Sequence, residues 1–387
     1  MTGIGTAAIS SAPEPHDRIA TIPRYQPGRS AEESMAEHGL DSAVKLASNE
    51  SPFGPLPGVA EAVARATDGS GRYPDHLATV LRETLAGRHG VAPEQVAVGC
   101  GSVGMLQQLL LAFAGPGDEV LFPWPSFIAY PQFTLLAGAT VTEAPLSAWA
   151  TDVDALLDRL TPRTTMALIA NPNNPTSTAL RTDALVRFVE AMPPNVLVVI
   201  DEAYREYVTD PDVPDATEQF RDRPGVAVLR TFSKAWALAG LRVGYLVGDP
   251  AVVRAADATL TPFSVSTAAQ AAALAALKQG DEVARRAAVV VAERTRVSDA
   301  LADRGLAVPE SQGNFVWLPA GPASIQLADA MERRGVVTRP FPTGIRVTIG
   351  TAEDNLHFLK ALEGALDEVP ATRSAWTAAA PAESGDR

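Results

Sequence analysis

The chain has 387 residues and a formal net charge of −13, so it can form two or three domains and is too acidic for broad binding to a nucleic-acid backbone. No apolar run reaches the roughly 18 residues that span a bilayer, and we expect no secretory signal at the N-terminus. The single cysteine, Cys100, excludes an internal disulfide, and the five histidines lack the spacing of metal ligands. These features predict a soluble, cytoplasmic protein without a metal site.

An α/β fold is expected for most of the chain. Between about residues 75 and 250, short runs rich in Val and Ile alternate with longer helical patterns, which is typical of parallel strands covered by helices. This alternation predicts a three-layer α/β/α domain with a mostly parallel central sheet. The expected strands lie at residues 96–98, 119–122, 139–142, 166–170, 196–200, 226–229 and 243–247.

A smaller α+β domain is expected in the C-terminal part, where the pattern changes. A long Ala-rich helical stretch covers residues 267–301, and strand-like segments at 314–318 and 345–349 flank a helical segment at 324–334. The predicted boundaries are 1–20 for a mobile tail, 21–70 for an N-terminal segment that joins the small domain, 71–265 for the large domain, 266–369 for the small domain and 370–387 for a second mobile tail.

The segment VAVGCGSVG, residues 96–104, matches the pattern Gly-x-Gly-x-x-Gly between an expected strand and an expected helix. The acidic residue that a dinucleotide-binding fold carries after the next strand is missing, so the match alone is a weak sign of such a fold. Gly101 still permits a tight turn, and the amides of Ser102 and Val103 open a helix whose dipole favours an anion. The segment predicts a phosphate site, with a plain strand-to-helix turn as the alternative.

Three polar residues stand out in or directly after expected strands. Asp201 ends an apolar run as a Walker B carboxylate does, but the sequence has no Gly-Lys pair, which excludes a P-loop. Open α/β sheets bind ligands at the carboxyl ends of their strands, so Asp201 is either a ligand residue or a solvated strand-end acid. Asn174, in the loop NPNNPTS, either faces the same crevice or lies in an ordinary turn. Arg346 is either a surface arginine or a clamp for a substrate carboxylate.

Lys234 lies in a segment, residues 229–245, whose members are mostly apolar, small or hydroxylic, unlike the surroundings of a surface lysine. In an apolar pocket flanked by cations, the pKa of a lysine amine falls and the amine becomes a nucleophile toward carbonyl groups. Thr231, Ser233 and Arg242 add two hydroxyls and a guanidinium, which together suit a phosphate dianion. The segment therefore predicts a reactive lysine beside an anion site.

Taken together, these segments resemble class I/II aminotransferases of fold type I, which depend on pyridoxal 5'-phosphate. Within that group they look most like histidinol-phosphate aminotransferases and the similar aromatic amino acid (phenylalanine) aminotransferases of actinobacteria. The resemblance covers residues 22–366, and the order and spacing of its motifs argue against chance. The motifs are KLASNE (45–50), RYPD (72–75), GCGS (99–102), NPNNPT (171–176), DEAY (201–204), SKAW (233–236), AGLR (239–242), NFVW (314–317) and RVTIG (346–350).

The resemblance implies a role for each matching position around the cofactor. Lys234 would hold the cofactor as an imine, and Asp201 would pair with its protonated pyridine nitrogen. Asn174 and Tyr204 would hydrogen-bond the phenolic oxygen of the ring, and Phe127 would lie over the ring face. The cofactor phosphate would be held by Gly101, Ser102, Val103, Thr231, Ser233 and Arg242, and by Tyr73 of the neighbouring subunit, which implies a homodimer.

On the substrate side, the resemblance implies that Arg346 binds the α-carboxylate, with Tyr25, Asn49 and Arg339 nearby. The reaction would be a ping-pong transfer of the amino group from an aromatic amino acid to 2-oxoglutarate through a pyridoxamine form of the cofactor. Histidinol phosphate is the alternative donor, because Arg339 could face a distal phosphate. Ser177 departs from the family pattern, since many members have glycine there, and the conformation of that turn stays open.

Two other classes of protein share parts of this pattern. A decarboxylase of the same fold would release carbon dioxide without depending on a 2-oxo acid. A cofactor-binding regulator would need an attached DNA-binding module, and residues 1–40 are too short and too rich in proline for one. The sequence therefore favours an enzyme that acts on small molecules, with no nucleic-acid or membrane partner.

Overall fold

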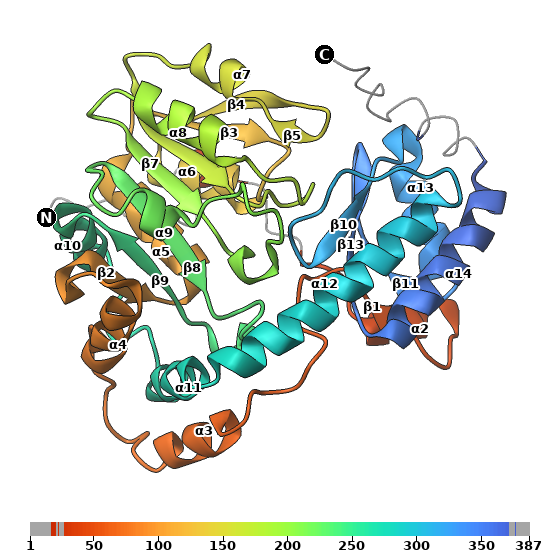
Figure 1. Ribbon diagram of the computed structural model, residues 1–387, viewed down its shortest axis with the longest axis horizontal. Helices are drawn as coiled ribbons and strands as arrows, with labels where there is room; N and C mark the ends of the chain where they lie inside the picture. The colour runs from red at the N-terminus through yellow and green to blue at the C-terminus, as the bar shows by residue number, and fades with distance from the viewer. Residues whose placement is uncertain (1–16, 21, 23–26, 371–375, 377–387) are drawn as a thin grey trace, which may run out of the picture.

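The fold consists of a larger and a smaller body. The computed structural model describes residues 17–20, 22, 27–370 and 376. In Figure 1 the larger body surrounds the main sheet, and the long helix α12 (Gly280–Ala302) crosses from it to the smaller body. The tails predicted at 1–20 and 370–387 lie almost wholly outside the described residues, so their mobility stays a prediction.

The main sheet provides the strand ends at which the site lies. Among the described residues it has eight strands in the order β2-β9-β8-β7-β6-β3-β4-β5, and each of the seven expected runs overlaps one of them. Strands β8, β7, β6, β3 and β4 run parallel, which confirms the α/β class. The strands are β2 (Val96–Gly99), β3 (Glu119–Trp124), β4 (Thr140–Ser147), β5 (Ala150–Thr151), β6 (Thr164–Ala170), β7 (Leu197–Asp201), β8 (Val226–Thr231) and β9 (Gly244–Gly248).

Strand β9 does not share the direction of the parallel strands. It pairs antiparallel with both of its neighbours, β2 and β8. The connection from β8 to β9 is short and contains only the 3₁₀ turn η3 (Ala239–Leu241), so the chain has no crossover helix to bring it back parallel. The main sheet is therefore mostly parallel, as expected, with β9 as an antiparallel strand within it.

Helices cover both faces of the main sheet, which explains why its strands read as continuous apolar runs. In β7, Val199 packs into the core beneath α5, while Val198 and Ile200 pack into the core beneath α8. Alternate side chains of one strand thus enter two separate cores. The covering helices are α5 (Gly101–Phe113), α6 (Ala129–Ala137) and α10 (Pro250–Ala258) on one face, and α7 (Val153–Leu157) and α8 (Thr182–Ala191) on the other.

The smaller body combines residues from both ends of the described chain. Its three-stranded antiparallel sheet has the order β10-β13-β12, and β1 (Val44–Lys45) pairs parallel with β11 (Val336–Val337). The N-terminal segment therefore contacts the C-terminal part, as expected, whereas the exact domain boundaries stay predictions. The other elements here are β10 (Phe315–Leu318), β12 (Arg339–Phe341), β13 (Gly344–Thr348), α2 (Ala31–His38), α13 (Ser324–Glu332) and α14 (Ala352–Glu368).

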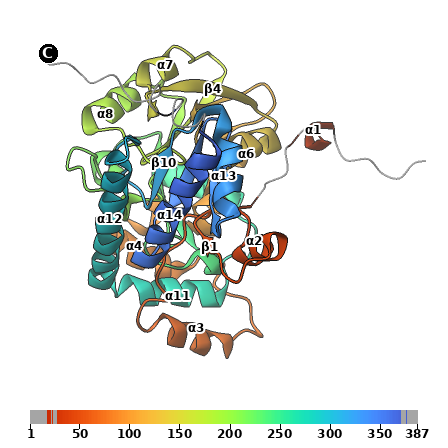
Figure 2. The ribbon, with the colours of Figure 1, turned by 90° about the vertical axis from the view of Figure 1, so that its right-hand side faces the viewer.

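The Ala-rich stretch expected at residues 267–301 is two helices rather than one. Helix α11 (Thr267–Leu277) ends before Gln279, and α12 begins at Gly280 in a new direction. The break separates two environments, because α11 packs against α3 (Val59–Thr67) and α4 (Thr79–His89), while α12 contacts α14 of the smaller body. Figure 2 shows this division, with α11 beside α3 at the bottom and α12 beside α14 above them.

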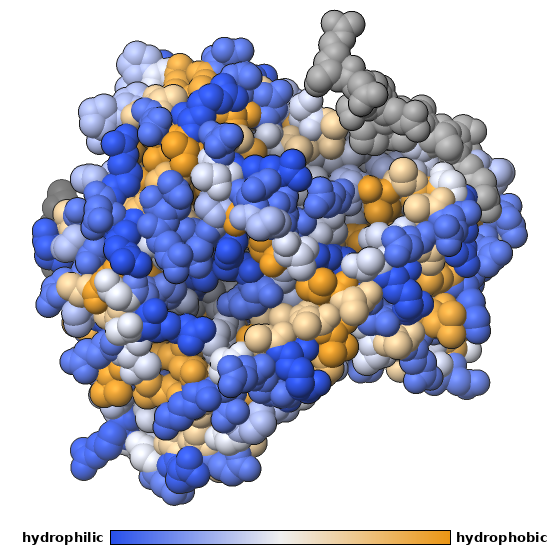
Figure 3. Space-filling view, viewed as in Figure 1, coloured by the Kyte–Doolittle hydropathy of each residue, from blue (hydrophilic) through white to orange (hydrophobic). Residues whose placement is uncertain are grey.

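The remaining elements are short, and the surface is mostly polar. Figure 3 shows hydrophilic residues over most of the visible face, with scattered apolar patches between them. Within the described part of the chain, no helix combines the length and the apolar character that crossing a bilayer requires. The short elements are α1 (Asp17–Ala20), η1 (Pro93–Gln95), η2 (Arg205–Tyr207), α9 (Ala216–Gln219) and η4 (Gly321–Ala323).

Candidate active site

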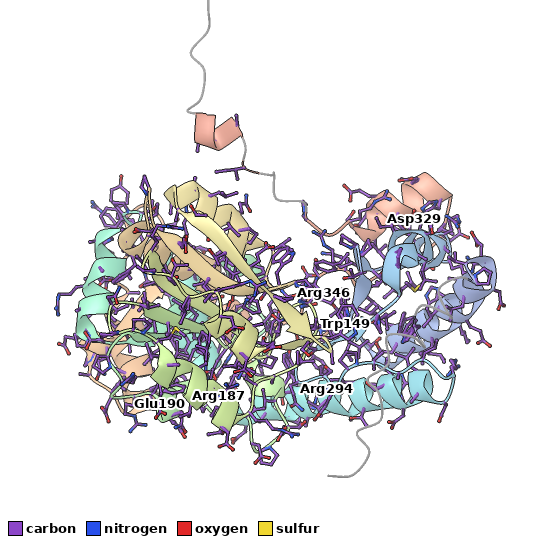
Figure 4. All side chains as sticks on the ribbon, turned by 90° about the horizontal axis from the view of Figure 1, so that it is seen from above. Trp149, Arg187, Glu190, Arg294, Asp329 and Arg346 are labelled. Carbon is purple, nitrogen blue, oxygen red and sulfur yellow. The ribbon has the colours of Figure 1, made fainter. Side chains whose placement is uncertain are left out.

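A cavity of about 310 Å³ lies where the carboxyl ends of β6, β7 and β8 meet the start of α5 and the smaller body. Figure 4 shows Arg346 between the two bodies, on the side of this cavity that the smaller body forms. The volume suits a small ligand. The predicted site residues that line the cavity are Asn49, Ser102, Val103, Phe127, Asn174, Asp201, Tyr204, Thr231, Ser233, Lys234, Arg242, Arg339 and Arg346.

Lys234 follows β8 in a tight turn that fixes its backbone. The carbonyl of Lys234 accepts from the amide of Ala237 at 3.0 Å, and the amide of Leu238 donates to the carbonyl of Phe232 at 2.9 Å. The Lys234 Nζ atom lies 5.7 Å from the ring centroid of Tyr204. Burial, and then the positive charge of Arg346, lower the pKa of Lys234 to about 8. A substantial fraction of the amine is therefore neutral and nucleophilic near physiological pH.

Asp201 is the last residue of β7, and its buried side chain lines the cavity. Its Oδ1 atom accepts from the amide of Ala203 at 3.2 Å, and its Oδ2 atom accepts from the hydroxyl of Tyr130 at 3.5 Å. Burial raises the pKa of Asp201 to about 6. A cationic group facing this carboxylate would favour its charged form, and the carboxylate would in turn keep that group protonated.

Tyr130 is a site residue that the sequence analysis missed. It lies in α6, its side chain is buried, and its ring packs edge-on against the ring of Phe127 with the centroids 5.6 Å apart. The only signal in the sequence is an aromatic residue three positions after Phe127, and such a pair is more often ordinary core packing. The contact between Tyr130 and Asp201 depends on the packing of α6 near the end of β7, which is a tertiary feature.

The N-terminus of α5 forms an anion cradle with the segment that follows β8. Gly101 has a φ of +76°, and a Cβ atom there would lie 2.9 Å from Nη2 of Arg242. The Nη1 atom of Arg242 donates to the carbonyl of Ala239 at 2.7 Å and to Oγ of Ser233 at 3.4 Å. Thr231 adds a second hydroxyl to the cradle. Helix-start amides, two hydroxyls and a guanidinium suit a phosphate dianion.

Gly244 is required for the close approach that brings Arg242 to α5. A Cβ atom at Gly244 would lie 2.4 Å from the amide nitrogen of Ser102 and 2.9 Å from the carbonyl oxygen of Arg230. Both atoms are backbone atoms, one in α5 and one in β8, so a larger residue would force one of these elements to shift. Gly244 was not among the predicted site residues, and a glycine at the start of an expected strand was its only signal in the sequence.

The opposite side of the cavity belongs to the smaller body and the N-terminal segment. Arg346, in β13, donates from Nη1 to Oδ1 of Asn174 at 2.8 Å and from Nη2 to the carbonyl of Ala47 at 2.6 Å. Asn49 donates to the hydroxyl of Tyr204 at 2.9 Å. Arg339 donates to the carbonyl of Pro27 at 3.0 Å, so the end of its side chain lies near the N-terminal segment.

Two predicted positions, Tyr73 and Gly101, are not part of the cavity lining of this chain. Tyr73 has 82% of its surface exposed, and its ring stacks on Phe263 with the centroids 4.6 Å apart. Gly101 lies behind the lining and supports Arg242, as described above. Tyr25 lies outside the described residues. The turn at Ser177 is now defined, because Ser177 is fully buried and has a φ of +66°, a conformation that glycine adopts readily.

Comparisons with known proteins agree with this geometry. Residues 41–362 match the family aminotransferase class I and II. The chain is 51% identical to an aromatic amino acid aminotransferase of Thermobifida fusca and 48% identical to one of Streptomyces coelicolor, over 91% of this chain and 97% and 98% of those proteins. A crystal structure of histidinol-phosphate aminotransferase from Sinorhizobium meliloti with pyridoxal-5'-phosphate superposes with a TM-score of 0.85 at 28% identity, covering 94% of this chain and 100% of that one. The chain belongs to the class I and II aminotransferases.

Proposed function

We propose that this aminotransferase uses pyridoxal 5'-phosphate to transfer the amino group of an aromatic amino acid to a 2-oxo acid. One observation carries the proposal: the amine of Lys234, with its lowered pKa, shares a cavity with the buried carboxylate of Asp201 and with an anion cradle. An aldehyde cofactor with a ring nitrogen and a phosphate needs these three groups together.

The residues present fit such a cofactor. Ser102, Val103 and Arg242 would hold its phosphate in a cradle that a side chain at Gly101 would fill, because a Cβ atom there approaches Arg242. Asp201 would face the ring nitrogen. The ring oxygen would lie within reach of Tyr204 and Asn174, and Phe127 would cover one ring face. Thr231 and Ser233 would complete the phosphate site with their hydroxyls.

The side chains of this chain divide the work of the reaction between them. When bound, the cofactor supplies a ring system that accepts the electrons of the broken Cα–H bond. The neutral Nζ atom of Lys234 would take the proton from Cα as a base and, once protonated, would deliver it as an acid to the C4′ carbon of the cofactor. Asp201 keeps the ring nitrogen protonated, and Arg346 orients the substrate through its α-carboxylate. The same groups serve the amino acid and the 2-oxo acid in turn.

Aromatic substrates are favoured over histidinol phosphate by the lining and by the relatives. Phe127, Ile128 and Phe341 give the cavity an apolar side against which a phenyl or indole ring can pack. The curated relatives at about half identity are named aromatic amino acid aminotransferases, whereas the histidinol-phosphate enzyme is a structural neighbour at 28% identity. Arg339 also lines the cavity and is the cation that a phosphorylated substrate would need.

A panel of amino donors tests the substrate class. The purified holoenzyme is assayed with 2-oxoglutarate and with phenylalanine, tyrosine, tryptophan or histidinol phosphate, and kcat/KM is compared. We expect the aromatic donors to lead. A higher kcat/KM for histidinol phosphate would contradict the aromatic assignment, and release of carbon dioxide without need of a 2-oxo acid would contradict transamination.

We infer that the enzyme works as a homodimer in which Tyr73 reaches the phosphate cradle of the partner. The exposure of Tyr73 and its stacking on Phe263 support this, because a large aromatic pair on a surface suits an interface. Mixing inactive Lys234→Ala chains with impaired Tyr73→Phe chains should restore activity, since one site of each mixed dimer then has both native residues. Absence of any rescue would mean that Tyr73 does not act across subunits.

A further inference from the structure

The loop that carries Asn174 ends at a residue whose hydroxyl group crosses to the smaller body. Ser177 is completely buried, and its φ of +66° is a conformation that costs free energy for any residue other than glycine. Its Oγ atom lies 2.7 Å from Oγ of Ser311 and accepts from the amide of Gly313 at 2.9 Å. Both partners belong to the segment that leads into β10.

The hydrogen atoms of this cluster have a fixed direction. The hydroxyl of Ser311 donates to the carbonyl of Phe315 at 2.7 Å, and a serine has only one hydroxyl hydrogen. Ser177 must therefore be the donor in its contact with Ser311. The result is a chain, here called the serine relay, that runs from the amide of Gly313 through Ser177 and Ser311 to the carbonyl of Phe315.

Two members of the serine relay, Ser177 and Phe315, lie close to residues of the candidate active site. Asn174, three positions before Ser177, accepts the hydrogen bond from Arg346 at 2.8 Å. Phe315 accepts the last hydrogen bond of the relay, and its ring lies 5.8 Å from the guanidinium carbon of Arg346 and packs edge-on against Tyr204 with the centroids 4.9 Å apart. The relay thus links the loop that bears Asn174 to the aromatic ring over which Arg346 lies.

The space around the relay leaves little freedom for other arrangements. A Cβ atom at Gly313 would lie 2.8 Å from Oγ of Ser177 and 2.9 Å from Cε1 of Phe315. The carbonyl of Ser177 also accepts from the amide of Gln312 at 2.8 Å. The loop that ends at Ser177 and the segment before β10 are therefore held in one fixed position relative to each other. The hydroxyls of Ser177 and Ser311 make the side-chain contact between them.

The segment around Gly313 is also anchored without the help of Ser177. Arg294, which Figure 4 shows on α12, donates from Nη1 to the carbonyls of Gly313 and Tyr207 at 2.9 and 3.0 Å. The Oε1 atom of Gln312 accepts from the amide of Thr209 at 2.8 Å. Loss of one relay hydroxyl should therefore leave the segment folded while it loosens the position of the Asn174 loop.

We propose that Ser177 and Ser311 are positioning residues that hold Asn174 and Arg346 in register and thereby set the affinity of the site for substrate carboxylates. This inference rests on the proposed function, in which Arg346 binds the α-carboxylate. The two serines act in both half-reactions, because the amino acid and the 2-oxo acid present the same carboxylate to Arg346.

Three variants of the holoenzyme test the relay: Ser177→Gly, Ser311→Ala and the double variant. Glycine is chosen at position 177 because it keeps the turn and removes only the hydroxyl. Each single variant should raise KM for phenylalanine and for 2-oxoglutarate, and Kd for 3-phenylpropionate read from the absorbance of the bound cofactor, by about five-fold, as expected for one buried hydrogen bond. The double variant should resemble the single variants, because both break one chain.

Thr164→Val is the matched control. Its buried hydroxyl accepts from the amide of Thr161 at 3.1 Å, but it lies at the start of β6, the end away from Asn174. This variant should lower Tm and leave both KM values unchanged. If the serine variants behave in the same way, or if their effects on KM multiply in the double variant, the relay does not position the site.

Arg346→Lys, measured in parallel, separates the two proposals. A rise in KM for Arg346→Lys together with unchanged KM values for the serine variants would overturn the relay and leave the carboxylate role of Arg346 intact. Unchanged KM values for Arg346→Lys would instead overturn the carboxylate role on which the relay depends.

Discussion

The two sides of the cavity are built in different ways. The side formed by the larger body, here called the cofactor wall (Ser102, Val103, Asp201, Thr231, Ser233, Lys234 and Arg242), comes from the ends of neighbouring strands and the start of one helix. The other side, here called the substrate wall (Ala47, Asn49, Arg339, Phe341 and Arg346), comes from the smaller body and the N-terminal segment.

The two walls differ in how their side chains are positioned. Short segments position the side chains of the cofactor wall, whereas contacts between distant parts of the chain position those of the substrate wall. In the cofactor wall, the side chains lie at strand ends or at the start of α5, and Lys234 and Arg242 belong to one short segment. In the substrate wall, the position of Arg346 depends on Ala47 and Asn174, which are 299 and 172 positions away. Changes in the first wall should therefore affect the chemical step, and changes in the second should affect substrate binding.

The largest expected effect is that of Lys234→Ala. Without the amine, the site has neither the group that would bind the aldehyde carbon nor the base for the Cα proton. Turnover should fall to background, and the absorbance of the cofactor bound as an imine should be lost. Lys278→Ala, an exposed lysine, is the control and should retain both. Appreciable turnover by Lys234→Ala would remove the central assignment of the cofactor wall.

Asp201→Asn should give the next largest effect. Loss of the charge should slow exchange of the Cα proton by about 10²- to 10³-fold, the usual size of one preorganised electrostatic contact, with a much smaller effect on cofactor affinity. Glu202→Gln is the matched control, since Glu202 faces away and pairs with the buried Arg230 at 2.7 Å. That variant should lower Tm and leave the rate of Cα proton exchange nearly unchanged. An unaltered exchange rate in Asp201→Asn would contradict the proposed contact with the ring nitrogen.

Arg346→Lys should change binding more than chemistry. Lysine cannot make the paired contacts of a guanidinium, so KM for both substrates should rise roughly ten- to hundred-fold, as for loss of a charged hydrogen bond. Steady-state kinetics with phenylalanine and 2-oxoglutarate measure the effect. If kcat fell while KM stayed constant, the distinction between the two walls would fail.

The smallest expected effect is a pH-dependent change in stability. The pKa of Lys234 is lowered from 10.5 to about 8, chiefly by burial, so the unfolded chain binds more protons than the folded chain between these values. The cofactor-free wild type should therefore gain stability as pH rises through this window, and the destabilising effect of the buried charge is fully present below it. Lys234→Met should have the higher Tm at pH 7, with a difference that shrinks toward pH 10.

Thermal unfolding of the cofactor-free proteins between pH 7 and pH 10 measures this change. The exposed Lys278→Met serves as the control and should show a Tm difference from wild type that is independent of pH. A Tm difference for Lys234→Met that grows with pH would mean that the amine is not destabilised by burial.

The fold was predictable where one segment decides the structure. The expected strand runs reappear in the sheet because residues buried on both faces must be apolar. The direction of β9 and the break between α11 and α12 were not predictable, because each depends on what the next element packs against. The short connection before β9 was visible in the sequence. It determines the direction of β9 only because β9 pairs with β8, and that pairing is known from the structure.

The sequence by itself determined which residues line the cofactor wall, because strand ends and helix starts place Asp201, Lys234 and Ser102 locally. Only the tertiary structure decided what surrounds them. The hydroxyl of Tyr130 at Asp201, the approach of Gly244 to the start of α5 and the contact between Asn174 and Arg346 join segments far apart in the chain. Burial and the distance between charges fix the pKa of Lys234, and neither exists before the bodies pack together.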